Sequence, residues 1–467
     1  MTREEGSTPD AGGGKSLASY AVSAALVMGA ASATAALTTL IYQRQQDRMH
    51  PGRPIHSMSM HGKSVVVTGA SSGIGKEAAG QLALMGATVI MACRSSDRCE
   101  AAARELQEVL TTAQAHTRAS VPTEGHMHDA SRSLKKPPGP QQRVGTVECM
   151  ELDLADPSSI ESFAARLNER LGTRGSGDGG GDNSGGSGCI GGGLHCLVNN
   201  AGAMFPCLSH ITDAGGGCAV ESTFAVNHLG PFALTLRLLP LLGRAGGAGD
   251  PARVVFVGSR LQRGGSDDYE GPSAHSEGCG GGSDDWVYRP FRAYATAKRA
   301  SLLCSGELER RLRGPHIEKP LAASATTDSA ALAASSRCNV TSTVVTPGFA
   351  PATGLGDGAA PLSRGLKACG VFAASLIGIG VSPAQGALAL VWAAASPEAG
   401  RHAGGRFLGW TDKVPGGTCV DVLTGGDAAG LSGGLGEVDA APEALQIWTL
   451  SEARTGVSWR EFWWCAP

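Results

Sequence analysis

Tyr294 and Lys298, two residues capable of acid–base chemistry, lie four positions apart in the segment FRAYATAKRA, residues 291–300. Side chains at this spacing stack on one face of a helix, so the lysine ammonium can approach the tyrosine phenol. A nearby cation favours phenolate and lowers the pKa of a tyrosine from its usual value of about 10. Tyr294 would then exchange a proton near neutral pH. The alternative is a chance pair on a solvated helix.

A second candidate site is the glycine-rich stretch TGASSGIGKE, residues 68–77, which follows an apolar run. Glycines let the backbone turn tightly and approach a pyrophosphate, and a helix that begins there supplies free N–H groups and its positive dipole. The alternative is a tight turn that binds nothing. We expect a phosphate-binding loop made of Gly69, Ser71, Ser72, Gly73, Ile74, Gly75 and Lys76.

The charges after this loop indicate which dinucleotide would bind. Folds that bind NAD carry an acidic residue about 20 positions on, at the end of the second strand, but this chain has Arg94 there. Together with Lys76, Arg94 predicts a 2′-phosphate partner and therefore NADP(H), unless both are solvated surface charges. Asp153 is placed to accept a hydrogen bond from the adenine amino group. Its alternative role, a helix N-terminal acid, suits Asp156 before Pro157 better.

Short apolar runs alternate with longer amphipathic ones around these motifs, which is typical of a parallel sheet flanked by helices. We therefore expect an α/β fold, a Rossmann-type doubly wound sheet, in a single domain over residues 61–467. The expected strands are residues 64–69, 87–94, 147–154, 194–202, 253–259, 339–348 and 404–409. The expected helices are residues 74–86, 219–242, 291–312 and 382–396.

Four low-complexity stretches interrupt this order, and they contain many of the 68 glycines. Their composition cannot bury enough apolar surface to offset the entropy of ordering them, so we expect disordered surface insertions. They are residues 112–143, 173–193, 264–285 and 320–336.

Charge and cysteine content exclude other classes of protein. A net charge of −3 provides no basic face for nucleic acid. The 13 cysteines show no CxxC pair and no metal-ligand spacing. We expect no metal site, and reduced thiols of a cytosol-like compartment instead of a disulfide framework.

Residues 1–60 form an N-terminal tail in which positions 16–42 carry no charge, a length sufficient for a membrane helix. Arg44, Arg48 and Arg53 follow this stretch and favour a catalytic domain on the cytoplasmic side. We expect an anchor in the endoplasmic reticulum or another organelle membrane. A cleaved signal peptide, a transit peptide and a peripheral helix are the alternatives.

The order of the motifs identifies a resemblance. TGASSGIG, NNAG, VNHLG, a serine that ends the fifth strand, YATAK and TPG occur in the order typical of the short-chain dehydrogenase/reductases. NHLGPF, ACR and LQIWTLSE are similar to the retinol dehydrogenase and WW-domain oxidoreductase branch. The resemblance spans roughly residues 63–457 and is broken by the four insertions.

The resemblance implies a role for each matching position. Tyr294 would be the catalytic acid/base, Lys298 would lower its pKa and bind the nicotinamide ribose, and Ser259 would orient the substrate carbonyl. Asn227 would anchor a proton-relay water. The alternatives are a strand-end cap for Ser259 and a helix side-chain bond for Asn227. The remaining cofactor-binding positions would be Asn200, Ala201, Gly202, Pro347 and Gly348.

The expected reaction interconverts a carbonyl and an alcohol on a lipophilic substrate, retinoid-, steroid- or lipid-like, and uses NADP(H). The resemblance also allows a homodimer. PATGLGDG and VFVGS are similar to the protochlorophyllide oxidoreductases, so reduction of a tetrapyrrole double bond is a second hypothesis. The third is a non-catalytic NADP-binding scaffold.

Overall fold

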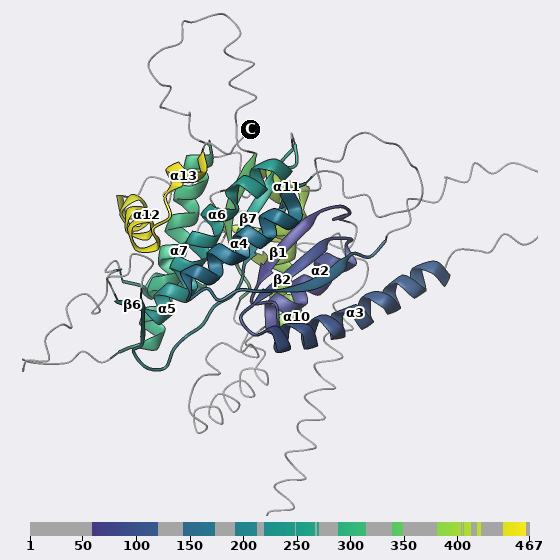
Figure 1. Ribbon diagram of the computed structural model, residues 1–467, viewed down its shortest axis with the longest axis horizontal. Helices are drawn as coiled ribbons and strands as arrows, with labels where there is room; N and C mark the ends of the chain where they lie inside the picture. Colours follow the sequence, from purple (N-terminus) through teal and green to yellow (C-terminus); the bar gives the residue numbers. More distant parts are fainter. Residues whose placement is uncertain are drawn as a thin grey trace, which may run out of the picture. The chain divides into compact units, whose positions relative to one another are not determined.

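In the computed structural model the chain divides into two units, residues 1–53 and 54–467, and all described residues belong to the second (Figure 1). The expected helix at 16–42 and the insertion at 320–336 lie outside the described residues, as do most of the insertions at 173–193 and 264–285. The described residues are 58–119, 143–172, 192–212, 219–247, 249–266, 269, 288–313, 339–348, 381–402, 404, 406–411, 418–421 and 442–463.

Within the described residues, eight strands form one sheet in the order β10-β9-β8-β7-β4-β1-β2-β3. All seven expected strands form, each shorter than expected, and they run parallel. The eighth, β10, pairs antiparallel with β9 and was not expected. The strands are β1 (Ser64–Thr68), β2 (Thr88–Cys93), β3 (Thr146–Glu151), β4 (Cys196–Asn199), β7 (Ala252–Val257), β8 (Val340–Thr346), β9 (Phe407–Thr411) and β10 (Thr418–Asp421).

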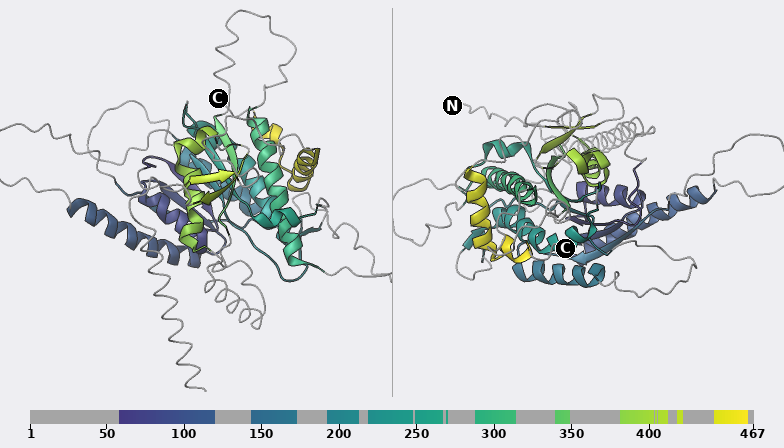
Figure 2. Two further views of the ribbon diagram at one scale, coloured as in Figure 1. Left: turned by 180° about the vertical axis from the view of Figure 1, so that it is seen from behind. Right: turned by 90° about the horizontal axis from the view of Figure 1, so that it is seen from above.

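Helices cover both faces of this sheet (Figure 2). Side chains alternate between the faces, as a strand requires: Val66 joins the core that α4, α6, α7 and α12 share, while Val65 and Val67 join the core of α2, α3 and α10. The parallel Rossmann-type fold is thereby confirmed. The helices are α2 (Gly73–Leu84), α3 (Ser96–Ala119), α4 (Pro157–Gly172), α6 (Gly230–Ala245), α7 (Pro290–Arg313), α10 (Pro383–Ala395), α11 (Pro397–His402), α12 (Pro442–Thr455) and α13 (Trp459–Trp463).

Two expected boundaries were wrong. Residues 219–242 do not form one helix, because β6 (Ala219–Glu221) pairs with β5 (His210–Thr212) and Glu221 then caps the short helix α5 (Ser222–Phe224) through the N–H groups of residues 223 and 224. A π-helix, η3 (Ala225–Leu229), follows before α6. In addition, residues 112–119, expected to be disordered, continue α3 as helix.

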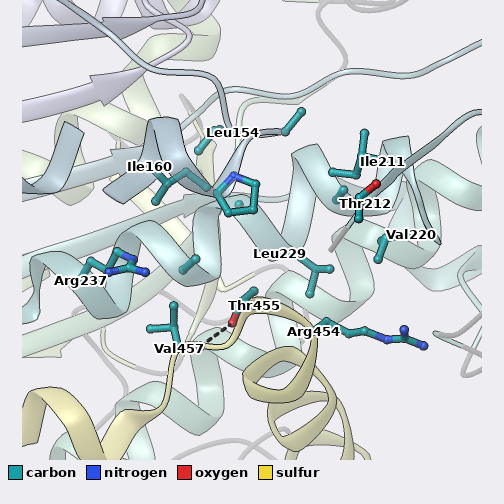
Figure 3. A pocket seen from close by; sticks show the side chains of 15 residues that line it. Leu154, Ile160, Ile211, Thr212, Val220, Leu229, Arg237, Arg454, Thr455 and Val457 are labelled. Carbon is teal, nitrogen blue, oxygen red and sulfur yellow. Dashed lines mark hydrogen bonds between the residues drawn. The ribbon is translucent and has the colours of Figure 1, made fainter. Parts of the chain in front are cut away.

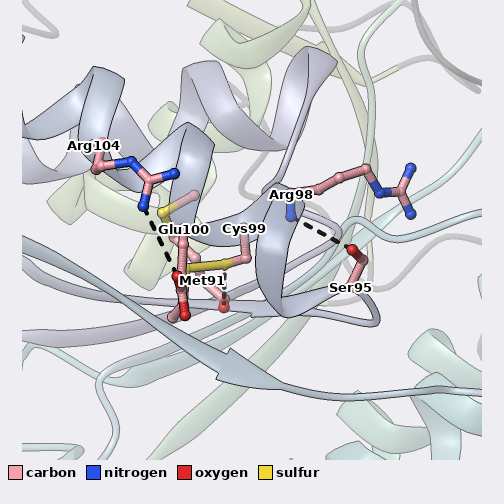
Figure 4. Close-up of a disulfide and its surroundings, with 7 residues drawn as sticks. Met91, Ser95, Arg98, Cys99, Glu100 and Arg104 are labelled. Carbon is pink, nitrogen blue, oxygen red and sulfur yellow. Dashed lines mark hydrogen bonds and ion pairs between the residues drawn. A yellow bond between two sulfur atoms is a disulfide. The ribbon is translucent and has the colours of Figure 1, made fainter.

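The prediction of reduced thiols throughout was also wrong. Cys99 on α3 and Cys149 on β3 form a disulfide (Figure 4) across a sequence separation of 50 residues. The spacing of the cysteines gives no signal of this pair, because only the packing of α3 on the sheet brings the two sulfurs together. Cys93, Cys196, Cys207 and Cys304 are free.

One described helical stretch, Ser222–Ala245, is long and apolar enough to cross a membrane. It comprises α5, η3 and α6, and 83% of its most apolar window is buried inside the fold. Such burial is typical of a core helix, so this stretch does not support a membrane span.

We expect Cys149→Ser to lower the free energy of unfolding by roughly 4 kcal/mol under oxidising conditions, because the crosslink restricts a loop of about 50 residues in the unfolded chain. Cys207→Ser, at an exposed free thiol, serves as the matched control and should leave stability unchanged. Chemical denaturation with and without a thiol reductant measures both. If the reductant leaves the free energy of unfolding of the wild-type protein unchanged, the pairing of Cys99 with Cys149 is contradicted.

Candidate active site

The glycine loop joins the end of β1 to the start of α2. Gly69 has φ +66° and Gly73 has φ +58°, a backbone region that residues with a side chain rarely adopt. A Cβ added at Gly69 would lie 2.8 Å from the Cα of Ala201. Ser72 at the N-cap of α2 makes no side-chain hydrogen bond to the helix. This side chain therefore does not cap the first-turn N–H groups of α2. An anion-binding loop needs such N–H groups for its ligand.

The NNAG segment after β4 fastens this loop to the centre of the sheet. The Asn200 side-chain amide donates to the carbonyls of Thr68 at 2.8 Å and Gly69 at 3.3 Å. The Thr68 hydroxyl accepts from the backbone N–H groups of Asn200 and Ala201 at 3.0 and 2.9 Å. A Cβ at Gly75 would collide with the Asn200 amide and lie 2.6 Å from the Gly69 carbonyl oxygen. Only glycine fits there, because the glycine loop and the NNAG segment lie in direct contact. We call these two segments together the cradle.

The two cations expected to select NADP(H) have different surroundings. Arg94 is exposed directly after β2 and forms no ion pair with another described residue. Lys76 instead pairs with Glu105 on α3, a partner that the sequence analysis missed. Glu105 is itself largely exposed, and a surface ion pair of this kind is weak. The contact of Arg94 and Lys76 with a 2′-phosphate stays a prediction.

The acidic residues after β3 make local turn contacts. The Asp153 carboxylate accepts from the Ala155 N–H at 2.9 Å, and Asp156 accepts from the Ser158 N–H at 2.9 Å at the start of α4. Asp156 thus has the helix N-terminal role expected of it. The contact of Asp153 with adenine stays a prediction.

Tyr294 and Lys298 lie on one face of α7, as their spacing predicts. The Lys298 Nζ is 5.5 Å from the centroid of the Tyr294 ring and donates to the Val257 carbonyl oxygen at 2.8 Å. The lysine is 3% exposed and the tyrosine 7%. This hydrogen bond fastens α7 to the carboxyl end of β7 and holds the ammonium beside the phenol.

Burial determines the protonation of this pair. It raises the pKa of Tyr294 to about 12 and lowers the pKa of Lys298 to about 8. The expected lowering of the tyrosine pKa was therefore wrong in direction, because burial removes the phenolate from water and so disfavours the charged form. At neutral pH Tyr294 carries its proton and Lys298 its charge.

Ser259 lies two residues beyond Val257 and begins the 3₁₀ helix η4 (Arg260–Gly264). Its Oγ accepts from the Leu261 N–H at 3.2 Å, which is the capping role noted as the alternative. That bond uses a lone pair and leaves the hydroxyl proton available to a substrate oxygen. The segment after η4 rests on α7, where the Ser266 N–H donates to the Thr296 hydroxyl at 2.9 Å.

Asn227 sits in the π-helix η3 and is 2% exposed. Its amide donates to the carbonyls of Ala203 at 2.6 Å and Thr223 at 2.7 Å, and its Oδ1 accepts from the Ala203 N–H at 3.2 Å. A Cβ added at Gly202 would lie 2.8 Å from the Asn227 Oδ1 and 3.7 Å from the Lys298 Nζ. The NNAG segment, η3 and α7 therefore meet at Gly202.

Pro347 and Gly348 follow β8, and Gly348 has φ +83°. The approach of α10 depends on Gly386, where a Cβ would lie 3.3 Å from the Pro347 Cβ and 3.2 Å from the Ile74 Cδ1. This places the Pro347 turn near the first turn of α2. The sequence analysis missed Gly386, because a glycine inside a helix gives no signal of the neighbour it accommodates.

An apolar pocket lies on another side of η3 and holds about 440 Å³ of empty space, open solvent included. Ala225 and Leu229 of η3 line it, and Arg237 and Arg454 stand at its edge (Figure 3). Tyr294, Lys298 and Ser259 do not line it. It is therefore distinct from the group formed by Tyr294, Lys298 and Ser259.

The lowered pKa of Lys298 predicts a stability effect. The unfolded pKa is near 10.5 and the folded one about 8, so the fold carries a penalty of about 3 kcal/mol below pH 8 that disappears as the pH rises towards 10.5. Because Lys298→Met also loses a hydrogen bond worth about 1–2 kcal/mol, we expect a net gain of about 1–2 kcal/mol at pH 7.

Denaturant unfolding of Lys298→Met at pH 7 and pH 10 measures this effect. The control is Lys63→Met, which removes a lysine paired with Asp250 at 2.6 Å near the surface and should lower stability slightly. If Lys298→Met lowers the free energy of unfolding at pH 7, the predicted penalty for burying the charged lysine is contradicted.

Comparisons with known proteins find similarity to short chain dehydrogenases. Residues 63–140 match the family model for short chain dehydrogenases. Retinol dehydrogenase 14 of Mus musculus is 32% identical over 275 residues, which cover 59% of this chain and 62% of that protein. The WW domain-containing oxidoreductase of Gallus gallus is 32% identical over 262 residues, which cover 56% of this chain and 48% of that protein. The match therefore spans less than two thirds of either relative.

Among solved structures, an uncharacterised protein from Mycobacterium Paratuberculosis is 26% identical, with a TM-score of 0.49, and the match covers 88% of this chain and 99% of that chain. The ordered motifs lie in this chain at the glycine loop, at the ends of the central strands and on α7. By its motifs and its matched sequences, the chain is similar to short-chain dehydrogenases, and among them to retinol dehydrogenases.

Proposed function

We propose that this protein is an NADP(H)-dependent oxidoreductase that interconverts a carbonyl and an alcohol on a lipophilic substrate. The observation that carries the proposal is the buried Lys298, which is fixed to Val257 beside Tyr294. Asn200 fastens the glycine loop to the end of β4, and β4 pairs with β7, the strand that carries Val257. A proton donor and a dinucleotide cradle therefore belong to one rigid part of the fold.

Gly69 and Gly75 let the loop pack directly on the NNAG segment, since a Cβ there would meet Ala201 and Asn200. The dinucleotide pyrophosphate would lie at the first turn of α2, which follows this loop. Arg94 and Lys76 would hold the 2′-phosphate, with Lys76 exchanging its surface partner Glu105 for the phosphate. Lys298 would contact the nicotinamide ribose, and Pro347 and Gly348 would border the nicotinamide ring. When bound, the nicotinamide supplies or accepts the hydride.

The residues of this chain handle the proton. In reduction, the Tyr294 O–H bond breaks and its proton passes to the carbonyl oxygen, while the carbonyl carbon receives the hydride. Ser259 donates its hydroxyl hydrogen to the same oxygen and orients it. The Lys298 ammonium stabilises the phenolate that remains. Because its pKa is about 12, Tyr294 is protonated at neutral pH, which suits the reductive direction. Alcohol oxidation reverses each transfer.

An apolar substrate is favoured by the surface around these residues. Leu261 is 49% exposed two positions after Ser259, Phe291 is 67% exposed one turn before Tyr294, and Leu208 is 43% exposed after the NNAG segment. We propose that these side chains contact the apolar part of the substrate. The names of the similar retinol dehydrogenases agree with a lipophilic alcohol or aldehyde.

The proposal includes attachment to a membrane through residues 16–42, in the endoplasmic reticulum or another organelle, with the catalytic domain facing the cytoplasm. It rests on the uncharged sequence and the arginines that follow it. A homodimer remains part of the proposal.

We expect Tyr294→Phe to keep the affinity for NADPH and to lose at least about 100-fold in turnover, because the proton donor is removed while the cradle is untouched. The measurement is NADPH consumption with aldehydes and ketones of increasing chain length, together with NADPH binding by fluorescence. Unchanged turnover in Tyr294→Phe would reject the role of this residue.

Gly75→Ala is the complementary variant, because its Cβ would collide with the Asn200 amide and should abolish NADPH binding. Gly247→Ala, at a glycine with open space around its Cβ position, is the matched control and should bind normally. A wild-type protein that binds NADPH but turns over none of these carbonyls would favour a non-catalytic scaffold.

A further inference from the structure

The π-helix η3 carries two adjacent buried polar residues, Asn227 and His228, each 2% exposed. They contact different parts of the fold. The Asn227 side chain bonds to Ala203 and Thr223, whereas the His228 ring contacts α7 and α12. Any group that fixes the His228 ring therefore also fixes the backbone that presents Asn227.

The contact of His228 with α12 is a hydrogen bond of 2.8 Å between its Nε2 and the Ser451 Oγ. The Ser451 hydroxyl has one proton and donates it to the Ile447 carbonyl at 2.6 Å, so the Nε2–H of His228 is the donor to Ser451. Burial lowers the pKa of His228 to about 3. The imidazole is therefore neutral, with its proton directed at α12.

Helix α12 is firmly attached to its neighbours. Trp448, 1% exposed, packs edge-on against Phe232 of α6 with ring centroids 5.0 Å apart. The Arg311 guanidinium of α7 stacks over the Trp448 ring at 4.4 Å. From the α7 side, the Ser301 hydroxyl shares its one proton between the carbonyl oxygens of Asn227 at 3.1 Å and Ala297 at 3.0 Å. The π-helix is thus held between α7 and α12.

We propose that His228 and Ser451 are positioning residues, whose hydrogen bond makes helix α12 hold the π-helix in the geometry that presents Asn227 to the active site. The inference rests on the proposed function, because it assigns Asn227 to the reaction. A purely structural pair would affect stability alone. A positioning pair also affects the rate of the chemical step, although neither residue touches the substrate.

The test compares Ser451→Ala with Ser305→Ala. Ser305 is a buried serine too, 1% exposed against 0% for Ser451, but its hydroxyl bonds to the Ser342 hydroxyl at 2.7 Å, between α7 and β8. We expect Ser451→Ala to lower kcat by between about 3-fold and 30-fold with unchanged affinity for NADPH. Ser305→Ala should lose similar stability and keep the wild-type kcat.

A double variant and a measurement that does not depend on turnover complete the experiment. His228→Leu combined with Ser451→Ala should lower kcat no further than either change alone, because both remove one interaction. Amide hydrogen exchange in residues 225–229 should rise in Ser451→Ala and not in Ser305→Ala. Equal kcat or equal exchange in the two serine variants would overturn the inference. If the wild type shows no turnover, the proposed function fails, and the exchange data still decide whether α12 holds the π-helix.

Discussion

The hydrogen bond between the Lys298 ammonium and the Val257 carbonyl is the interaction on which the site depends. A charge at 3% exposure is costly to bury, and no carboxylate causes the shift of its pKa, which burial alone lowers to about 8. The backbone of β7 holds the ammonium, so its position is set by the sheet. Because Tyr294 lies one turn earlier on the same helix, the cation stands beside the phenol as soon as α7 packs on β7.

The rest of the site is assembled by the ends of neighbouring parallel strands. Thr68 and Asn200 join the ends of β1 and β4, and the segment that follows β4 reaches η3 through Ala203 and Asn227. Gly202 brings this segment within reach of Lys298. The glycine loop, Asn227 and the Tyr294–Lys298 pair are therefore held by neighbouring strand ends of one sheet, an arrangement that would suit the precise positioning which the proposed hydride transfer requires.

Much of this arrangement could be predicted from sequence, because it depends on local patterns. Apolar runs located seven strands, the glycines located the loop, and the spacing of Tyr294 and Lys298 placed both on one helix face. Features that depend on distant packing were missed. The Cys99–Cys149 disulfide, the Lys76–Glu105 pair and the fit of α10 at Gly386 each join residues far apart in the chain. The pKa direction of Tyr294 was wrong because the sequence indicates a neighbouring cation but not the depth of burial.

The central claim is that a charged Lys298 supports proton donation by Tyr294. The pH dependence of kcat/KM for NADPH-dependent carbonyl reduction tests it most directly, because this quantity reports the pKa values of the free enzyme. Since the pKa of Lys298 is about 8, kcat/KM should be constant below that pH and fall about tenfold per unit above it. In Lys298→Met it should be low and independent of pH across the same range. A wild-type profile that stays flat through pH 8, or a methionine variant with the wild-type rate, would contradict the account.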